Sequence, residues 1–358
     1  MKTEKETTLL ISFEDIKKII FYVGINQLMD ELIHNLESAF LSFDSTKIKT
    51  PARSGFNYTI PNIGLLEWMP LLQEGEEVML KMVGYHPQNP SNYNYPTILS
   101  NISRYSTQTG HLKSIIDGTF LTAFRTGAAS AVATKYMAKV NSKILGLIGC
   151  GTQAITQLHA LSRIYDFEKV LIYDIDNNTI NSFDERCKTL QIDALIYPSS
   201  INTILSHSDI ICTATSINIG EGPLFHNTVT KPWLHINAVG SDFPGKIEIP
   251  LSFLNASFVC PDHKEQAFKE GECQQLTQKD IKADIVNLVK NNANYTYVKD
   301  ITSVFDSTGW ALEDYIVEKL FVKYAHKLEL GQYIDFGSYI EDSKNPYHFL
   351  NVDVFCKT

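Results

Sequence analysis

A glycine-rich turn between an apolar strand and a helix constrains the fold of this chain more than any other feature. Residues 143–148 form an apolar strand pattern, and Gly-Cys-Gly-Thr-Gln-Ala follows at 149–154, opening a helix that continues to about residue 163. In a Gly-x-Gly-x-x-Ala turn, the first glycine makes the tight bend, the second lets a pyrophosphate approach the backbone, and the third position needs only a small residue. The helix N-terminus then offers free N–H groups to phosphates. The segment therefore predicts a dinucleotide site.

An acidic residue at the end of the next strand indicates which dinucleotide is bound. The strand pattern at 169–173 ends at Asp174, about 20 residues beyond the glycine turn, where a carboxylate hydrogen-bonds the adenine ribose. A carboxylate there would repel the 2′-phosphate of NADP, so we expect NAD as the cofactor. Asp176 either assists or caps the following helix. The alternative to a cofactor site is a glycine-rich turn that binds nothing.

The chain divides into two structural patterns. After the glycine turn, strand patterns at 169–173, near 194, and at 209–213, 233–239 and 257–261 alternate with helices, which is typical of a parallel sheet with helices on both faces. Residues 51–109 instead contain short strands separated by Pro, Gly and Asn, which indicates a β-rich, partly antiparallel unit. We therefore predict an α/β fold, with a Rossmann-type doubly wound parallel sheet over 127–326 and an α+β domain formed by 1–126 and 327–358.

Several helices are predicted outside this alternation. Ser12 and Asp15 form a capping-box pattern before a helix that ends at Gly24, and apolar residues at helical spacing follow from 25 to 40. Residues 119–137 predict a helix rich in Ala, Gly, Ser and Thr, whose small side chains allow close approach of a neighbouring backbone or a ligand. A further helix is expected over 315–328, and an irregular tail after Gly331.

The charge and cysteine content exclude several classes of protein. The 358 residues carry a net charge of −9, which argues against a nucleic-acid partner because phosphate binding needs a basic face. Six cysteines without a Cys-x-x-Cys pair fit a reducing compartment better than a disulfide framework. No segment approaches the roughly 20 apolar residues that cross a bilayer, and the N-terminus lacks the pattern of a signal peptide. We expect a cytoplasmic protein with no membrane partner.

Three isolated basic residues are candidates for binding an anionic substrate. Arg53, Lys81 and Arg125 each lie among apolar or small residues. Such a residue is commonly a structural ion pair or a side chain that extends to solvent. A buried guanidinium needs a carboxylate partner, however, and a ligand can supply one. This second interpretation suits Arg125 best, because the rest of its helix is small and apolar.

A carboxylate follows the strand pattern at 233–239. Asp242 lies in a turn rich in Gly and Pro, where the loop can face a nicotinamide ring. An Asp before Pro-Gly is also commonly a turn residue that caps its own backbone. The segment after strand 209–213 either passes under the nicotinamide ribose or is a simple turn. The residues expected at the cofactor are Gly149, Gly151, Thr152, Gln153, Ala154, Asp174, Thr213, Thr215, Val239 and Gly240.

Several segments, taken in order, carry a family resemblance that covers nearly the whole chain. They are Leu66-Glu67-Trp68-Met69-Pro70, Lys81 with His86-Pro87-Gln88-Asn89, the helix from Leu121 through Arg125 to Ser130, His235 to Gly240, Asp242-Phe243-Pro244-Gly245-Lys246, Glu270-Gly271-Glu272, and Phe305 to Gly309. Together they resemble the ornithine cyclodeaminase/mu-crystallin family. The Asp-x-Pro-Gly-Lys segment is typical of its bacterial ornithine cyclodeaminase branch.

The resemblance implies a reaction and roles for the site residues. Arg53, Lys81 and Arg125 would bind the α-carboxylate of an amino acid, Glu67 would help to order that site, and Asp242 would be the catalytic residue that moves protons. The expected reaction is the NAD-dependent conversion of L-ornithine to L-proline and ammonia. Hydride leaves the substrate Cα and returns to a cyclic imine, so the NAD is not consumed. The family also implies a homodimer built through the α+β domain, which would bind substrate, with the C-terminal tail returning to that domain.

Departures from the cyclodeaminase pattern bear on the substrate. Residues 82–85, Ser241 and Phe243 differ from the family pattern beside the expected pocket, so lysine or another diamino acid is an alternative substrate. An amino-acid dehydrogenase, a ketimine reductase and a crystallin-like protein that only binds NAD(P) are alternative functions. The chain has no His-Glu-x-x-His or paired metal spacing and no Gly-x-Ser-x-Gly turn, so we expect neither a metal nor a serine nucleophile.

Overall fold

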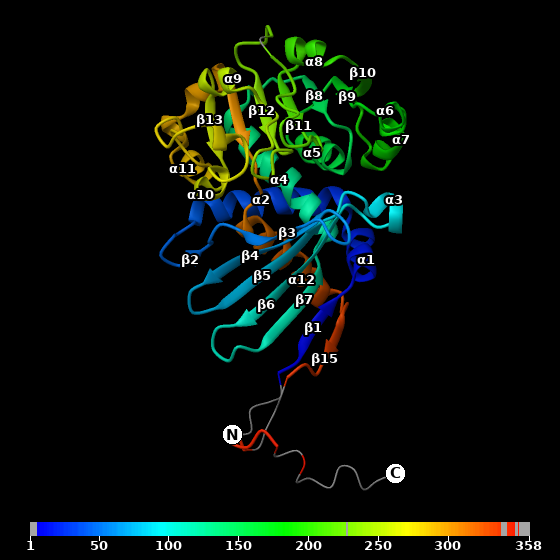
Figure 1. The fold of residues 1–358 in the computed structure, drawn as a ribbon, viewed down its shortest axis with the longest axis vertical. Helices are drawn as coiled ribbons and strands as arrows, with labels where there is room; N and C mark the ends of the chain where they lie inside the picture. The colour runs from blue at the N-terminus through cyan, green and yellow to red at the C-terminus, as the bar shows by residue number, and fades with distance from the viewer. Residues whose placement is uncertain (1–5, 227, 338–341, 348–349, 351–358) are drawn as a thin grey trace.

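The protein contains two separate β-sheets joined by buried helices. The computed structural model describes residues 6–226, 228–337, 342–347 and 350. In Figure 1 one sheet lies above the long helices α2 (Ile25–Ser42) and α4 (Thr119–Met137), and the other lies below them. Within the described residues no helix is long and apolar enough to cross a membrane.

The first sheet is mostly antiparallel and is built largely from the N-terminal part of the chain. Its order is β15-β1-β7-β6-β5-β4-β2, and β3 pairs with β4. Only the β1–β7 pair is parallel among the pairs described. The strands are β1 (Thr8–Ile11), β2 (Ile48–Lys49), β3 (Ser54–Tyr58), β4 (Gly64–Gln73), β5 (Glu77–Tyr85), β6 (Ile98–Ser106), β7 (Leu112–Asp117) and β15 (Gln332–Ile334).

The second sheet is the predicted Rossmann-type sheet. Its strands run parallel in the order β10-β9-β8-β11-β12-β14-β13 over the described residues. The order reverses beside β8, where a doubly wound sheet binds its ligand. The strands are β8 (Ile144–Ile148), β9 (Lys169–Tyr173), β10 (Leu195–Pro198), β11 (Ile210–Thr213), β12 (His235–Ala238), β13 (Phe258–Pro261) and β14 (Ser303–Asp306).

Helices cover both faces of the second sheet and one face of the first. Separate apolar clusters fill the two faces of the second sheet, and a third joins the first sheet to α2, α4 and α12. The remaining α-helices are α1 (Phe13–Val23), α3 (Asn89–Tyr93), α5 (Thr152–Ser162), α6 (Asn177–Asn181), α7 (Phe183–Cys187), α8 (Ile201–His207), α9 (Leu251–Asn255), α10 (Lys264–Ala267), α11 (Ile285–Lys290) and α12 (Ala311–Lys327).

The small residues of α4 allow the close packing that the sequence predicted. The helix is buried along most of its length, and it contacts α5, α2 and α12. A Cβ atom at Gly127 would lie 2.4 Å from the backbone oxygen of Thr156 on α5. Glycine is therefore needed here to bring the helix that carries Arg125 against the helix that opens at the glycine turn.

Two parts of the first sheet and one strand of the second differ from the sequence analysis. The tail after Gly331 was expected to be irregular, but Gln332–Ile334 pairs antiparallel with β1. Neither β1 nor β14 was predicted, since each has only four residues and no alternating pattern. The capping box at Ser12 and the helix end at Gly24 are confirmed.

The domain boundaries remain a prediction. The strands of each sheet lie within the expected ranges, with β15 returning to the first sheet. Helix α12 falls inside the range 127–326 except for its last residue, yet it contacts α1, α2, α4, β4 and β5. By these contacts, α12 packs with the first sheet. Part of the predicted segment 327–358 lies outside the described residues.

Candidate active site

A cavity of about 540 Å³ brings together most of the predicted substrate residues. Its walls come from β3, β4, β5, α4 and the start of α5, and from loops that follow β11, β12 and β14. Those loops leave the carboxyl edge of the parallel sheet, which is where doubly wound sheets bind ligands. The predicted residues that line the cavity are Arg53, Glu67, Lys81, Arg125, Gln153, Val239 and Asp242.

Arg53 joins the first sheet to two loops of the second. Its guanidinium pairs with the Glu270 carboxylate, and its Nε lies 3.7 Å from Glu67 Oε2. Its Nη2 also donates to the backbone oxygen of Asp242 at 3.1 Å. Burial lowers the pKa of Arg53, but the two carboxylates outweigh burial and hold it above the ordinary value. Arg53 is therefore a permanent cation beside the Asp242 loop.

Lys81 and Arg125 share counter-ions supplied by α12. Asp314 Oδ1 accepts from Lys81 Nζ at 2.8 Å and from Arg125 Nε at 3.0 Å, and Glu313 Oε2 accepts from Arg125 Nη1 at 2.8 Å. Burial lowers the pKa of Lys81 to about 8 despite Asp314. The sequence analysis missed both acids. Asp314 is separated by 189 positions from Arg125 and by 233 from Lys81, and nothing in the pattern of α12 indicates these contacts.

Burial brings the pKa values of two carboxylates in this cluster close to neutral pH. Burial raises the pKa of Glu270 to about 7 against the opposing effect of Arg53, and it raises that of Glu313 to about 8 against Arg125. Burial also raises the pKa of Glu67. Among the described residues, Glu313 Oε1 and Asp314 Oδ2 have no hydrogen-bond partner. The site therefore contains groups that can change protonation when an anionic ligand enters.

Asp242 points at a lysine and does not cap its own turn. Its side chain is 41% exposed, and Oδ1 accepts from Lys246 Nζ at 2.8 Å. The carboxylate makes no other hydrogen bond among the described residues, so the turn-capping alternative is not seen. The Asp242 pair raises the pKa of Lys246 against the lowering effect of its burial. Lys246 also lines the cavity, and its i,i+4 spacing from Asp242 was the signal that the sequence offered.

The glycine turn has the shape that a dinucleotide site requires. Gly149 has a φ of +92°, and a Cβ there would lie 2.5 Å from Ala214 O. A Cβ at Gly151 would meet no atom of the described chain within 4 Å, which leaves its backbone open to a ligand. Within the described residues no side chain caps the N-terminus of α5, so its first N–H groups stay available, as phosphate binding needs.

Asp174 has a structural contact in addition to its predicted role. Its Oδ2 accepts from Cys150 N at 2.7 Å, and its Oδ1 accepts from Asp176 N at 3.0 Å. These bonds fix the carboxylate against the glycine turn and leave further lone pairs for a ribose. Asp176 accepts from Asn178 N at 2.9 Å and is the N-cap of α6, so it adopts its helix-capping alternative.

The other predicted cofactor residues meet at a carboxylate that the sequence analysis did not single out. The hydroxyls of Thr213 and Thr215 both donate to the fully buried Glu248. The backbone N–H of Gly240 donates to the same side chain at 3.1 Å. These residues lie together at the ends of β11 and β12, and their contacts with a cofactor stay a prediction.

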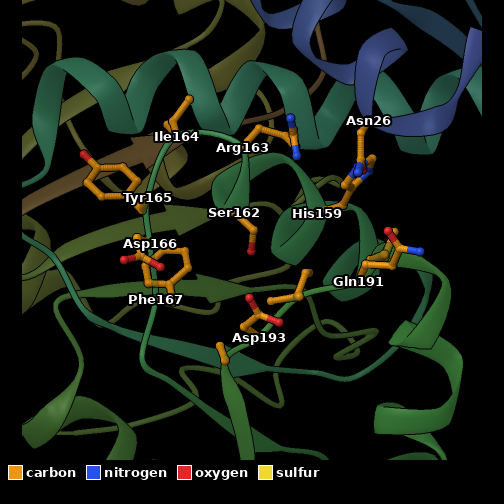
Figure 2. Close-up of a pocket in the computed structure, with 13 residues that line it drawn as sticks. Asn26, His159, Ser162, Arg163, Ile164, Tyr165, Asp166, Phe167, Gln191 and Asp193 are labelled. Atoms are coloured by element: carbon orange, nitrogen blue, oxygen red, sulfur yellow. The ribbon is translucent and has the colours of Figure 1, made fainter.

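A second cavity of about 390 Å³ lies at the opposite edge of the parallel sheet. It is formed by the C-terminal end of α5 and the segments that precede β9 and β10, and none of the predicted site residues is among its described lining (Figure 2). Figure 2 shows Asn26 of α2 beside His159, whose Nε2 lies 2.9 Å from Asn26 Oδ1. Burial lowers the pKa of His159 to about 4, so that imidazole is neutral at physiological pH.

Comparison with known proteins gives the family of the chain. The family description "Ornithine cyclodeaminase/mu-crystallin family" matches residues 15–327. The L-lysine cyclodeaminase of Streptomyces rapamycinicus is 36% identical over 95% of this chain and 99% of that enzyme. The alanine dehydrogenase of Archaeoglobus fulgidus is 31% identical over 92% and 98%, and the ornithine cyclodeaminase of Agrobacterium tumefaciens is 29% identical over 85% and 83%.

Solved structures agree in fold over nearly the same extent. A lysine cyclodeaminase structure that concerns recognition of L-lysine, L-ornithine and L-2,4-diaminobutyric acid has a TM-score of 0.91 and 38% identity, covering 96% of this chain and 99% of that one. An archaeal alanine dehydrogenase dimer with bound NAD has a TM-score of 0.82 and 29% identity, covering 92% and 100%. The chain therefore belongs to the ornithine cyclodeaminase/mu-crystallin family.

Proposed function

We propose that this protein is an NAD-dependent cyclodeaminase of L-diamino acids, with L-ornithine and L-lysine as the substrates to compare. The observation that carries this proposal is the meeting of Asp242 with two buried cations, Lys81 and Arg125, and the half-buried Arg53 in one cavity at the edge of the parallel sheet. Ornithine is the substrate that the sequence analysis predicted. The similarity to an L-lysine cyclodeaminase, and to a structure that concerns recognition of lysine and ornithine, supports the wider class.

The cations explain how the α-carboxylate of the substrate is oriented. Arg53 precedes β3, and Lys81 and Arg125 lie on β5 and α4, so a carboxylate among them is fixed in position as well as in charge. Each cation already has a protein counter-ion. The raised pKa of Glu313, about 8, helps here, because a neutral Glu313 leaves more of the Arg125 charge for the ligand.

Asp242 supplies the proton transfers of the reaction. NAD, held by the glycine turn and Asp174, would supply reversible hydride transfer with the substrate Cα. Between removal and return of the hydride, Asp242 takes a proton from the terminal ammonium, the free amine attacks the imine carbon, and the departing α-amine takes the proton and leaves as ammonia. A positioned carboxylate of this kind contributes about 10²–10⁴-fold to the rate. Lys246 holds Asp242 at 2.8 Å and keeps its carboxylate directed into the cavity.

The cofactor proposal is NAD. The open Gly151 backbone, the uncapped α5 and the fixed Asp174 carboxylate fit the pyrophosphate and adenine ribose of a dinucleotide. Alanine dehydrogenase and iminosuccinate reductase relatives have been solved with NAD, and a pyrroline-2-carboxylate reductase with NADH. The five described cysteines are free and buried, which supports the further proposal of a reducing, cytoplasmic location.

A net redox enzyme is the second candidate, because relatives include an alanine dehydrogenase at 31% identity and a Δ1-pyrroline-2-carboxylate reductase at 32%. The deciding experiment incubates the protein with L-ornithine or L-lysine and a catalytic amount of NAD, and follows ammonia, cyclic amino acid and NADH absorbance. Ammonia with proline or pipecolate and no accumulated NADH supports the cyclodeaminase. NADH that rises with substrate supports a dehydrogenase, and binding of NADH without turnover of any diamino acid supports a crystallin-like binding protein.

We also propose that the protein is a homodimer that pairs through the open face of its first sheet. In Figure 1 α12 lies behind β4 to β6, and the other face of these strands is turned to the viewer. That face is apolar: Leu66 is 41% exposed and Phe56, opposite it on β3, is 69% exposed. The outward residues on the neighbouring positions are Trp68, Pro70, Leu72, Val78, Leu80 and Met82.

A second copy of the same chain is the occupant that fits this face. A large apolar patch on a folded protein commonly marks an interface, and a related alanine dehydrogenase has been solved as a dimer. The test is Leu66→Asp, analysed by light scattering with size-exclusion chromatography. We expect the mass to fall from dimer to monomer, whereas Phe21→Asp, at an 87% exposed position on α1, leaves it unchanged. A wild-type monomer, or a Leu66→Asp dimer, would contradict the proposal.

A further inference from the structure

A buried carboxylate links the two loops that form the cofactor and catalytic sides of the cavity. Glu248 has no solvent exposure and lies six residues beyond Asp242. Its Oε1 accepts from the backbone N–H of Thr215 at 2.8 Å and from the Thr215 hydroxyl at 2.6 Å. Its Oε2 accepts from the Thr213 hydroxyl at 2.6 Å and from the backbone N–H of Gly240 at 3.1 Å. One side chain thus binds donors from both loops.

We propose that Glu248 is a positioning residue that holds the segment 213–215 and the Asp242 loop at a fixed separation. The inference rests on the proposed function, which gives Asp242 its role. Gly240 lies two residues before Asp242, and the chain continues from Thr215 to Ile217, which lines the cavity opposite. A change in the Glu248 contacts therefore moves two walls of the site relative to each other.

The geometry around Glu248 explains why position 240 is glycine. A Cβ at Gly240 would lie 2.3 Å from Glu248 Oε1 and 2.6 Å from its carboxyl carbon. The carboxylate occupies the space that any side chain at position 240 would need. The glycine that the sequence analysis placed at the cofactor is thus required by a contact inside the protein.

Further buried carboxylates support Glu248 from behind. Glu272 accepts from the backbone N–H groups of Glu248 at 2.8 Å and Ile249 at 3.2 Å. Asp306, at the end of β14, accepts in turn from the N–H groups of Glu272 at 2.9 Å and Cys273 at 2.8 Å. Each acid fixes the backbone that carries the next one. The position of Glu248 is therefore set by the parallel sheet and does not depend on the loop alone.

Glutamine at position 248 cannot reproduce these contacts although it has the same shape. The hydroxyls of Thr213 and Thr215 can rotate and accept a hydrogen bond, but the backbone N–H groups of Thr215 and Gly240 can only donate. In either orientation, the glutamine NH₂ group meets one of these two N–H groups. A donor facing a donor leaves a buried polar group unsatisfied. Glu248→Gln therefore releases one of the two loops.

The experiment compares Glu248→Gln with Asp209→Asn. Asp209 is a buried carboxylate at the opposite edge of the same sheet, where it accepts from the N–H groups of Lys143 and Ile144 and from Lys231 and Trp233. Its replacement creates the same kind of donor conflict far from Asp242. Four quantities are measured for both variants. They are amide hydrogen exchange at Thr215 and Gly240 in the cofactor-free protein, the affinity for NADH by titration, kcat for ammonia release, and the melting temperature.

For Glu248→Gln, we expect at least tenfold faster exchange at Thr215 or Gly240, weaker NADH binding, and a kcat lower by about 10²-fold, the loss that a misplacement of about 1 Å causes. Asp209→Asn should lower the melting temperature and leave the other three measurements near wild type. Equal effects of the two variants, or wild-type exchange and kcat in Glu248→Gln, would overturn the inference.

Two further measurements keep the result interpretable. If Glu248→Gln does not fold, Thr213→Val removes a single buried hydroxyl donor to Glu248 and should give a smaller effect in the same direction. An unchanged exchange rate at Gly240 in that variant would then count against the inference. If the wild-type protein releases no ammonia from any diamino acid, the proposed function fails, while amide exchange and NADH titration still test the role of Glu248.

Discussion

Replacing Asp242 by asparagine separates proton transfer from every other property of the site. Asparagine keeps the shape of the side chain, and its oxygen can still accept from Lys246, but it cannot take a proton from the substrate ammonium. The Asp242 side chain is 41% exposed, but its partner Lys246 is buried and keeps one hydrogen-bond acceptor while losing its counter-ion. Exchanging the charged acceptor of this buried ammonium for a neutral one lowers the free energy of unfolding by about 1–3 kcal/mol. We therefore expect a folded variant with normal NADH affinity.

The expected loss of activity follows from the chemistry of the missing group. General acid–base catalysis by a positioned carboxylate contributes about 10²–10⁴-fold, which corresponds to about 3–5.5 kcal/mol of activation free energy. We expect this loss to fall on kcat for ammonia release, because the substitution leaves Arg53, Lys81 and Arg125, the proposed carboxylate-binding residues, unchanged. In the proposed reaction, hydride transfer from Cα precedes the blocked step, so we expect a burst of NADH equivalent to the enzyme concentration.

The assay follows ammonia release with catalytic NAD at saturating L-ornithine or L-lysine. NADH affinity is measured in parallel by fluorescence titration. Asp166→Asn serves as the control, because its side chain is 97% exposed and does not line the active-site cavity. This variant should match the wild type in both measurements. A wild-type rate of ammonia release from Asp242→Asn would refute the proton-transfer role, and a loss of NADH affinity would show that Asp242 acts through the cofactor.

Other substitutions test the remaining parts of the site. In Arg125→Lys, the lysine cannot bind Glu313 and Asp314 at the same time, so the cation is no longer held in place. The KM for the amino acid should rise roughly 10- to 100-fold, with a smaller change in kcat. An unchanged KM in steady-state kinetics would argue against carboxylate binding by Arg125. Asp174→Ala should weaken NADH binding roughly tenfold or more without weakening NADPH, as competitive titration of the two would show. Burial raises the pKa of Glu318 from 4.5 to about 7, so its stabilising contribution is present below pH 4.5 and is lost as pH rises through 7. The free energy of unfolding, measured with denaturant across that pH range, should decline less in Glu318→Gln than in the wild type. Equal declines in the two proteins would contradict the raised pKa of Glu318.

The Rossmann half of the molecule could be predicted because its signals are local. A strand, a glycine turn and a helix follow one another at 144–162, and each is specified by residues within a few positions. Asp174 follows the next strand at a spacing that the parallel crossover sets. The predicted strand at 169–173 and helix at 119–137 match the observed bounds. Strands β1, β14 and β15 were missed, and β1 and β15 pair with each other from opposite ends of the chain, where no local pattern indicates the pairing.

Sequence motifs also identified most of the predicted residues that line the cavity, but not the α12 acids that hold Lys81 and Arg125. Arg53, Lys81, Arg125 and Asp242 come from four separate segments, and their grouping followed from the family resemblance. Glu67, Glu270 and Lys246 lie in the family segments, but the partners of Lys81 and Arg125 on α12 follow no sequence pattern. Glu313 and Asp314 are separated from the cations that they bind by at least 188 positions of the chain.

The sequence by itself therefore determined the parallel sheet, the dinucleotide turn and the identity of the charged residues at the site. The sheet and the turn depend on periodicity and on short spacings, which a linear chain displays directly, whereas the charged residues were grouped by the family resemblance. The tertiary structure alone decided which carboxylate neutralises which cation, and that Glu248 binds the N–H groups of Thr215 and Gly240. A buried charge must find its partners in three dimensions, and the folding of two sheets against shared helices is what brings those partners within hydrogen-bonding distance.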